Sequence, residues 1–251
     1  MATPPPADGV RLNKFLASCG LGSRRACEEL ITNGHIEING EVIIELATRV
    51  FSTDHVKYDG KLVRAAEIMT VVLNKPRGYM CTAFDPEGRP TIYELLPRTF
   101  HSLSYVGRLD FHSQGLILLT NSGELNQQLS HPSRKMEKEY AITLDRGFDR
   151  DLTPKLLEGI RLEEGVAKAE RLTFESRKRL KMVLTQGMNR QIRRMFEALD
   201  YKVKQLERIR IGSYAPIDLS TGEYRIMHRK DMELVTKNPP APKSKGAKNN
   251  V

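Results

Sequence analysis

The feature that most constrains the fold is a continuous apolar run at residues 115–120 (GLILLT), which directly follows a charged stretch. A short uninterrupted run of this kind is typical of a strand that is buried on both faces. Arg108 and Asp110 precede it in the sequence YVGRLDFHSQ. A carboxylate with a pKa near ~3.9 is ionised at neutral pH and is costly to bury unpaired. Asp110 therefore needs a cation or water, and Arg108 would point to the same side of an extended chain.

The composition favours a polyanionic partner and excludes several other classes of protein. Lys and Arg outnumber Asp and Glu by 40 to 31, a net charge of +9 that suits contacts with phosphates. No apolar stretch approaches the ~18–20 residues of a membrane-spanning helix, and the N-terminus has no secretory signal. Three cysteines without a C-x-x-C motif indicate a reducing compartment, so a cytoplasmic location is expected. Six histidines without ligand spacing predict no metal site.

Two tails and two folded units are expected along the 251 residues. Residues 1–9 are rich in proline, and residues 236–251 combine lysine with proline, so both segments are expected to be disordered. The basic tail would be a loose phosphate-binding segment or simply a solubilising end. The second unit, residues 68–232, mixes strand and helix patterns without a repeat, which indicates an α+β fold with a mixed, largely antiparallel sheet.

The first unit, residues 10–63, is expected to contain two short helices followed by small strands. Ser23 can cap the second helix and Gly34 can end it. Arg24 and Arg25 occupy the first turn of that helix, where the helix dipole disfavours cations. They make sense there if a phosphate docks on them, and the alternative is two solvated surface arginines. Hairpin turns are predicted at Asn39-Gly40 and at Asp59-Gly60.

The sequence VRLNKFLASCGLGSRRACEELITNGHIEINGEVI resembles the alpha-L RNA-binding module, which was first recognised in a small-subunit ribosomal protein. Modules of this kind are attached to several RNA-modifying enzymes and read the shape and backbone of folded RNA. The resemblance therefore implies a structured RNA partner without defining the chemistry. The residues that it suggests for RNA contact are Arg11, Asn13, Lys14, Ser23, Arg24, Arg25 and Asn39.

Three patterns in the second unit bear on Asp110. The sequence MEKEYAITLD suits a strand that carries Tyr140, and TVVLNK suits a strand that ends at Lys75. Lys75 would bind phosphate or simply end its strand. In NRQIRRMFEALDY, apolar residues recur at helical spacing, and Arg193 falls at the edge of that stripe. Its guanidinium could reach inward, and a buried ion pair is expected. The last strand pattern, YKVKQLERIRIG, has imperfectly spaced apolar positions.

Taken in order, the motifs GRLDFHSQGLILLTNSGEL, KEYAITL, QGMNRQIRRMFEAL and LERIRIG resemble the RsuA/RluB/RluE/RluF family of ribosomal RNA pseudouridine synthases. That family also carries an alpha-L module ahead of its catalytic domain. The second half of the pattern is most similar to the RluF and RluB branch. This implies as substrate a uridine of large-subunit (23S) ribosomal RNA near the peptidyl transferase centre, in free RNA or in a ribosomal subunit precursor.

The resemblance implies a role for each residue of the site. Asp110 matches the catalytic aspartate, Tyr140 the tyrosine that stacks on the target base, and Arg193 the basic partner of the aspartate. The flipped uracil is detached, turned and rejoined to the ribose through carbon, with Asp110 as nucleophile or as electrostatic partner of the sugar. No cofactor or metal is expected, and a monomer is expected to suffice. The residues expected to bind substrate are Lys75, Arg108, Arg190 and Gln191.

Three alternatives compete with this interpretation. An RNA methyltransferase would need a Gly-rich turn between a strand and a helix, and the one G-x-G, at residues 20–22, lies inside the RNA-binding unit. A small-subunit (16S) pseudouridine synthase would share all the motifs. A non-catalytic ribosome-assembly factor would keep the fold and lose the reaction, and the intact set of Asp110, Tyr140 and Arg193 argues against that loss.

Overall fold

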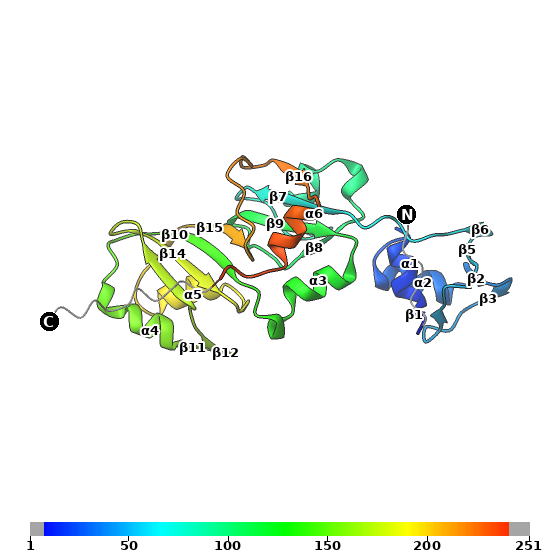
Figure 1. Ribbon diagram of the computed structural model, residues 1–251, viewed down its shortest axis with the longest axis horizontal. Coiled ribbons are helices and arrows are strands. Elements are labelled where there is room, and N and C mark those ends of the chain that lie inside the picture. Colours follow the sequence, from blue (N-terminus) through cyan, green and yellow to red (C-terminus); the bar gives the residue numbers. More distant parts are fainter. Residues whose placement is uncertain (1–7, 241–251) are drawn as a thin grey trace. The chain divides into compact units, whose positions relative to one another are not determined.

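The computed structural model describes residues 8–240, which divide into two compact units. The first comprises the described residues up to 70 together with residues 97–104 and 120–123, and the second comprises the rest (Figure 1). Most of both expected tails lies outside the described residues. The few described residues of these segments form hydrogen bonds with the folded units. Arg49 donates to the carbonyl oxygens of Asp8 and Gly9 at 3.0 Å, and the Asn238 side chain accepts the backbone N–H of Glu137 at 2.8 Å.

The first unit packs two helices against small antiparallel strands. The helices are α1 (Leu12–Ser18) and α2 (Arg24–Thr32), and their inner faces share one core with the strands. Two short strands, β1 (Val10–Arg11) and β4 (Arg49–Val50), pair with each other. The remaining strands are β2 (Ile36–Ile38), β3 (Glu41–Val42), β5 (Val56–Tyr58) and β6 (Lys61–Leu62), in the order β3-β2-β5-β6.

The local signals expected in this unit are confirmed. The Ser23 hydroxyl accepts the backbone N–H of Ala26 at 3.1 Å and so caps α2. After α2, Gly34 takes the left-handed conformation (φ 76°) that commonly follows a helix end. Positive φ angles at two consecutive residues confirm both hairpin turns, Asn39-Gly40 (52° and 92°) and Asp59-Gly60 (45° and 75°).

The second unit is built on a mixed sheet in the order β13-β14-β10-β15-β9-β7-β16, with β8 paired to β9. β15 and β9 are parallel, whereas the pairs β10–β14, β10–β15, β13–β14 and β16–β7 are antiparallel. This confirms the α+β class. The strands are β7 (Thr70–Lys75), β8 (Ser104–Val106), β9 (Gln114–Thr120), β10 (Lys138–Leu144), β13 (Arg171–Phe174), β14 (Arg179–Leu184), β15 (Val203–Ile211) and β16 (Tyr224–Ile226), with a separate hairpin of β11 (Ile160–Leu162) and β12 (Gly165–Ala167).

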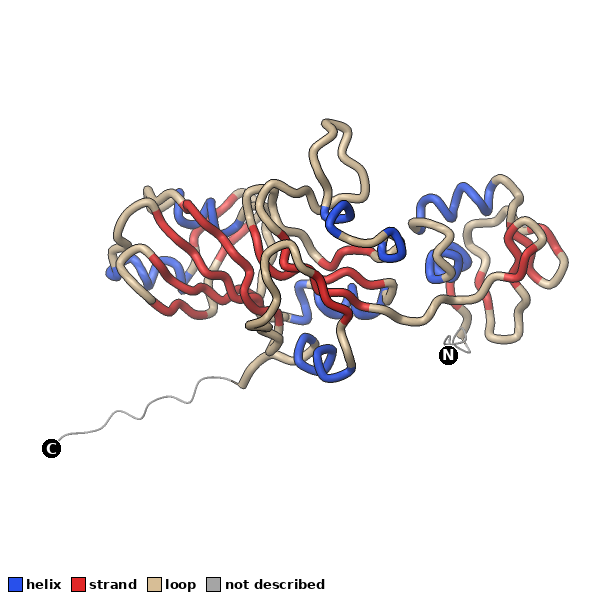
Figure 2. The backbone as a smooth tube through the Cα atoms, turned by 90° about the horizontal axis from the view of Figure 1, so that it is seen from above, coloured by secondary structure: helices blue, strands red, loops and turns tan. Residues whose placement is uncertain are grey.

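Helices cover this sheet over two buried clusters. Figure 2 shows the strands in red, side by side, and the helices in blue. α4 (Thr153–Glu158) and α5 (Gln191–Glu197) contribute to the cluster over β10 and β14. α3 (Gly123–Ser130) and α6 (Arg229–Val235) contribute to the cluster over β7 and β9. None of the helices between residues 8 and 240 is long and apolar enough to span a membrane. Short 3-10 turns occur at Ile92–Leu95, Arg98–Phe100, Pro132–Arg134 and Arg150–Leu152.

The apolar run after Asp110 is the buried central strand β9, as expected, since residues 115–120 are all buried. At its start, Gly115 (φ 107°) lies opposite Arg208 in the parallel pair with β15. A Cβ at Gly115 would overlap the backbone nitrogen and carbonyl of Arg208. Glycine is therefore required at this position both by its own conformation and by the closeness of the two strands.

The imperfect spacing of the last strand is explained by bulges in β15. Glu139 lies opposite Arg210, but the next residue, Tyr140, lies opposite Arg208, so Ile209 is an extra residue in the ladder. A second shift of the same kind occurs between Thr143 and Leu144 of β10. Each bulge reverses the face toward which the following side chains point.

We expect Gly115→Ala to lower the free energy of unfolding by at least about 2 kcal/mol, because the new methyl group forces β9 and β15 apart. Urea denaturation followed by circular dichroism measures the change. Gly147→Ala is the matched control, since the nearest atoms to a Cβ there lie at 3.7 and 3.8 Å. A Gly115→Ala protein as stable as the control would show that the two strands separate without cost.

Candidate active site

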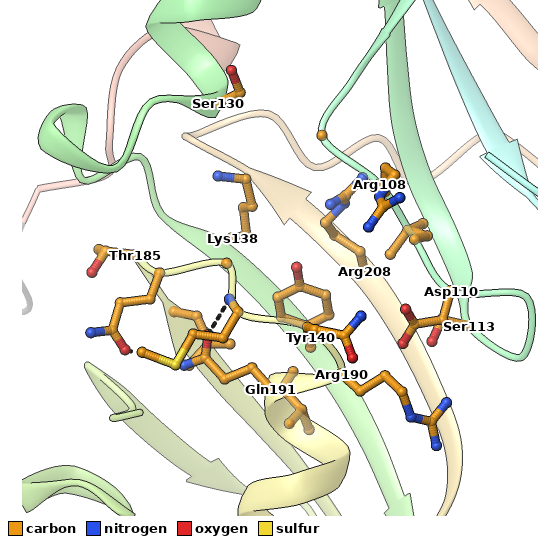
Figure 3. Close-up of a pocket in the computed structure, with 18 of the residues that line it drawn as sticks. Arg108, Asp110, Ser113, Ser130, Lys138, Tyr140, Thr185, Arg190, Gln191 and Arg208 are labelled. Carbon is orange, nitrogen blue, oxygen red and sulfur yellow. Dashed lines mark hydrogen bonds between the residues drawn. The ribbon is translucent and has the colours of Figure 1, made fainter. Parts of the chain in front are cut away.

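A cavity of about 360 Å³ opens in the second unit, a size within the usual range of ligand pockets. Its walls come from five parts of the chain: the loop before β9, the turn after α3, strand β10, the loop between β14 and α5, and strand β15. Figure 3 shows Asp110 on one side of this space and the ring of Tyr140 beside it. Both residues are half-buried and line the cavity, as expected from the sequence.

The loop that carries Asp110 is fixed by Lys75, the last residue of β7, which is fully buried. Its ammonium group donates to the carbonyl oxygens of Pro76 (3.0 Å), Asp110 (3.2 Å) and Ser113 (2.7 Å). Burial lowers the pKa of Lys75 to about 8, although Cys81 and the Asp110 carboxylate oppose part of this decrease. Because all three donors are occupied within the protein, the prediction that Lys75 binds substrate is wrong.

Arg193 holds the same loop from the other side. It donates to the carbonyl oxygens of Val203 (2.9 Å) and His112 (3.1 Å). In the described residues it forms no ion pair with Asp110 within 4.0 Å, so the expected direct pair is absent here. Burial and the charge of Arg190 lower the pKa of the Arg193 guanidinium, and Asp110 raises it by less. Asp110 thus acts on Arg193 through space, while the hydrogen bonds of Arg193 connect the loop that carries Asp110 to β15.

The other residues expected to bind substrate have different environments. Arg108 and Arg190 are exposed and line the cavity, so both can contact a ligand. Arg190 has a left-handed backbone (φ 46°), a strained conformation for a side chain of this size. Gln191 also lines the cavity but is buried: it accepts the N–H of Met188 at 3.1 Å and donates to Gln186 at 3.2 Å. The hydrogen bonds of Gln191 therefore stabilise the loop between β14 and α5.

Two cations in the cavity wall, Lys138 and Arg208, were missed by the sequence interpretation. Strand alternation could have identified Lys138, because it lies two residues before Tyr140 and therefore on the same face of β10. Arg208 could not be assigned a face, since the bulge at Ile209 interrupts the alternation that such an assignment needs.

In the first unit, the residues expected to contact RNA divide into two groups. Arg11, Lys14, Arg24 and Arg25 are exposed and free to do so. Asn13 is buried, and its amide donates to Glu28 at 2.6 Å, so the prediction that it contacts RNA is wrong. Ser23 and Asn39 are exposed but already have structural roles: Ser23 caps α2, whereas Asn39 donates to Asp54 at 2.9 Å and accepts the N–H of His55 at 2.9 Å.

Comparison with protein families assigns each unit. Residues 10–56 match the S4 domain, and residues 69–198 match the family described as RNA pseudouridylate synthase. Together the two matches define the class of enzymes in which an S4 domain precedes a pseudouridylate synthase domain. Within residues 8–240 no three side chains of the kinds that hold metals are grouped as a metal site.

Individual relatives support the same assignment. The chain is 39% identical over 241 residues to ribosomal large subunit pseudouridine synthase B of Pseudomonas aeruginosa, with 91% of this chain and 62% of the relative covered. It is 37% identical over 221 residues to the enzyme of that name from Bacillus subtilis, covering 86% of this chain and 91% of the relative. A crystal structure of a pseudouridylate synthase superposes with a TM-score of 0.67 at 29% identity, covering 90% of this chain and 99% of that one. The chain belongs to the RNA pseudouridylate synthase family, and the resemblance seen in its motifs is confirmed.

We expect Lys75→Met to reduce the free energy of unfolding by about 2–4 kcal/mol, because it leaves three carbonyl groups, one of them buried, without this donor. Chemical denaturation at neutral pH measures the loss. Lys204→Met, at an exposed position of β15, should change stability by no more than about 0.5 kcal/mol. Equal stabilities for the two variants would mean that the ammonium group is not needed to hold the loop.

Proposed function

We propose that this enzyme converts a specific uridine of large-subunit ribosomal RNA to pseudouridine, near the peptidyl transferase centre. The relatives from P. aeruginosa and B. subtilis bear the name of a ribosomal large subunit pseudouridine synthase, which favours the large subunit over the small one. The chain spans 62% of the length of the P. aeruginosa relative and 91% of the B. subtilis relative. The pocket-lining residues all belong to the second unit, and we propose that a monomer carries out the reaction.

One observation carries the proposal: among the residues that line the cavity, Asp110 is the single carboxylate. Its loop is held through backbone carbonyls by Lys75 and Arg193, which leaves the carboxylate free to face a ligand. The ring of Tyr140 lies beside it and offers a flat surface for a base (Figure 3). A uridine can reach this position only if it is flipped out of the RNA stack.

The reaction requires no net gain or loss of electrons. The bond from ribose C1′ to uracil N1 breaks, the base turns, and a bond forms from C1′ to C5. The proton on C5 is released and N1 gains a proton. The Asp110 carboxylate serves either as the nucleophile or as the charge that stabilises the electron-poor sugar, and both roles require its ionised form. Tyr140 holds the detached base, and its hydroxyl group is placed to take part in proton transfer.

We expect Asp110→Asn to lower tritium release from RNA labelled at uridine C5 by at least about 10³-fold, because the amide carries no charge and is a poor nucleophile. RNA binding should remain unchanged. In cells that express only this variant, mapping of ribosomal RNA should reveal one missing modification in the large subunit.

The matched control for that experiment is Asp151→Asn, an exposed position outside the cavity, which should retain full activity. Equal tritium release by the wild type and Asp110→Asn would refute the catalytic role. If the missing pseudouridine lies in small-subunit RNA instead, the proposed reaction is right and the proposed large-subunit substrate is wrong.

We expect the double variant Arg24→Ala/Arg25→Ala to bind the RNA substrate about tenfold more weakly, because these exposed side chains place two positive charges beside the free N–H groups of α2. The rate at saturating RNA should be unaffected. Filter binding at several salt concentrations measures the change, and Arg24→Lys/Arg25→Lys serves as the charge-preserving control. Undiminished affinity in the alanine variant would assign RNA binding to other residues.

A further inference from the structure

The charges in the wall of the cavity are unbalanced. Four of the residues that line it are cations, and one is a carboxylate. The exposed pair, Arg108 and Arg190, can be neutralised by solvent and salt. The other two cations, Lys138 and Arg208, lie deeper, and there a charge without a partner is costly.

Arg208 is the more deeply placed of the two, with 2% of its surface exposed. Its Nε donates to the carbonyl oxygen of Leu116 at 2.6 Å, whereas one terminal nitrogen of the guanidinium is buried without a hydrogen-bond partner. Within the described residues it forms no ion pair. An arginine whose donors are only partly used in a ligand cavity is poised to accept an anion.

Lys138 lies on the same side of the sheet. Its ammonium donates to the carbonyl oxygens of Leu129 (3.2 Å) and Met136 (3.4 Å), which leaves one of its three donors free. Burial, with repulsion from Arg208, lowers the pKa of Lys138 to about 8. In Figure 3 the side chains of Lys138, Tyr140 and Arg208 project from neighbouring strands toward the same space, and Arg108 lines the same cavity.

The bulge in β15 explains why these cations lack carboxylate partners. Alternation along the chain puts Glu137 and Glu139 on one side of β10, and Lys138 and Tyr140 on the other. Because Ile209 is an extra residue, Arg210 joins the two glutamates while Arg208 joins Tyr140. Arg210 forms ion pairs with Glu137 at 2.9 Å and with Glu139 at 2.8 Å, so the carboxylates near Arg208 in sequence are already bound on the opposite face.

We propose that Lys138 and Arg208, with Arg108 at the rim, bind a phosphate group of the nucleotide whose uracil lies against Tyr140. This subsite rests on the function proposed above and specifies how the flipped nucleotide is held. RNA brings one phosphate with every nucleotide, and lysine and arginine are the side chains that bind such a group most strongly. Anchoring the phosphate on one side of Tyr140 would leave the ribose to face Asp110 on the other.

The test compares uridine with uridine 5′-monophosphate and uridine 3′-monophosphate in binding to the full chain, measured by NMR titration. We expect one of the monophosphates to bind the wild type at least about tenfold more tightly than uridine. Lys138→Met should abolish this preference, whereas Lys138→Arg should keep it, and inorganic phosphate should displace the monophosphate but not uridine. The preference should also decrease as the pH rises above about 8, because Lys138 then loses its charge.

Lys204→Met is the control, since it removes one lysine from the exposed part of β15, and it should keep the preference. Thermal unfolding confirms that each variant is folded. Equal affinities of the wild type for uridine and both monophosphates, or an intact preference in folded Lys138→Met, would overturn the subsite. If the monophosphate preference is absent but the wild type still releases tritium, the subsite is wrong and the proposed function stands. If the preference is present but no tritium is released, the proposed function is wrong and the phosphate subsite stands.

Discussion

A single buried ammonium group, that of Lys75, fixes the position of the loop before β9. Lys75 is removed from water and is stabilised by three carbonyl oxygens, two of them from the loop that carries Asp110. Arg193 binds a third carbonyl of that loop, at His112. Lys75 and Arg193 thus bind the backbone around Asp110 and leave its carboxylate oxygens without a hydrogen-bond partner among the described residues. A rigid loop with a free carboxylate is the arrangement that a preorganised site requires, since no rearrangement is needed when substrate arrives.

The carboxylates near the pocket in sequence form ion pairs outside it. Glu137 and Glu139 bind Arg210 on the opposite face, and Glu164 binds Arg194 at 2.7 Å outside the cavity. The cavity is left with a positive wall and one negative side chain. Such a site attracts a polyanion from a distance and concentrates it, while the lone carboxylate acts only at close range.

Local signals in the sequence predicted much of the fold. A helix cap at Ser23, hairpin turns and the buried strand β9 each depend on neighbouring residues, and each was found where it was expected. The family motifs also identified Asp110 and Tyr140 as residues of one pocket. The assignments that failed depend on distant partners. The ammonium group of Lys75 is occupied by carbonyl oxygens that lie 35 and 38 residues further along the chain. The amide of Asn13 is occupied by the carboxylate of Glu28. Charge and spacing alone cannot show which donors are already occupied.

The extra residue in β15 has a consequence for how chains of this architecture can vary. If Ile209 entered the regular ladder, Arg208 and Arg210 would stand two residues apart in an even pleat and share one face of the sheet. Either the pocket would then lose Arg208, or Glu137 and Glu139 would lose Arg210. Deleting Ile209 would instead leave Arg208 opposite Tyr140 and Arg210 opposite Glu139, as the present register has them. Relatives should therefore differ freely in the identity or presence of residue 209, but not in the register that it separates.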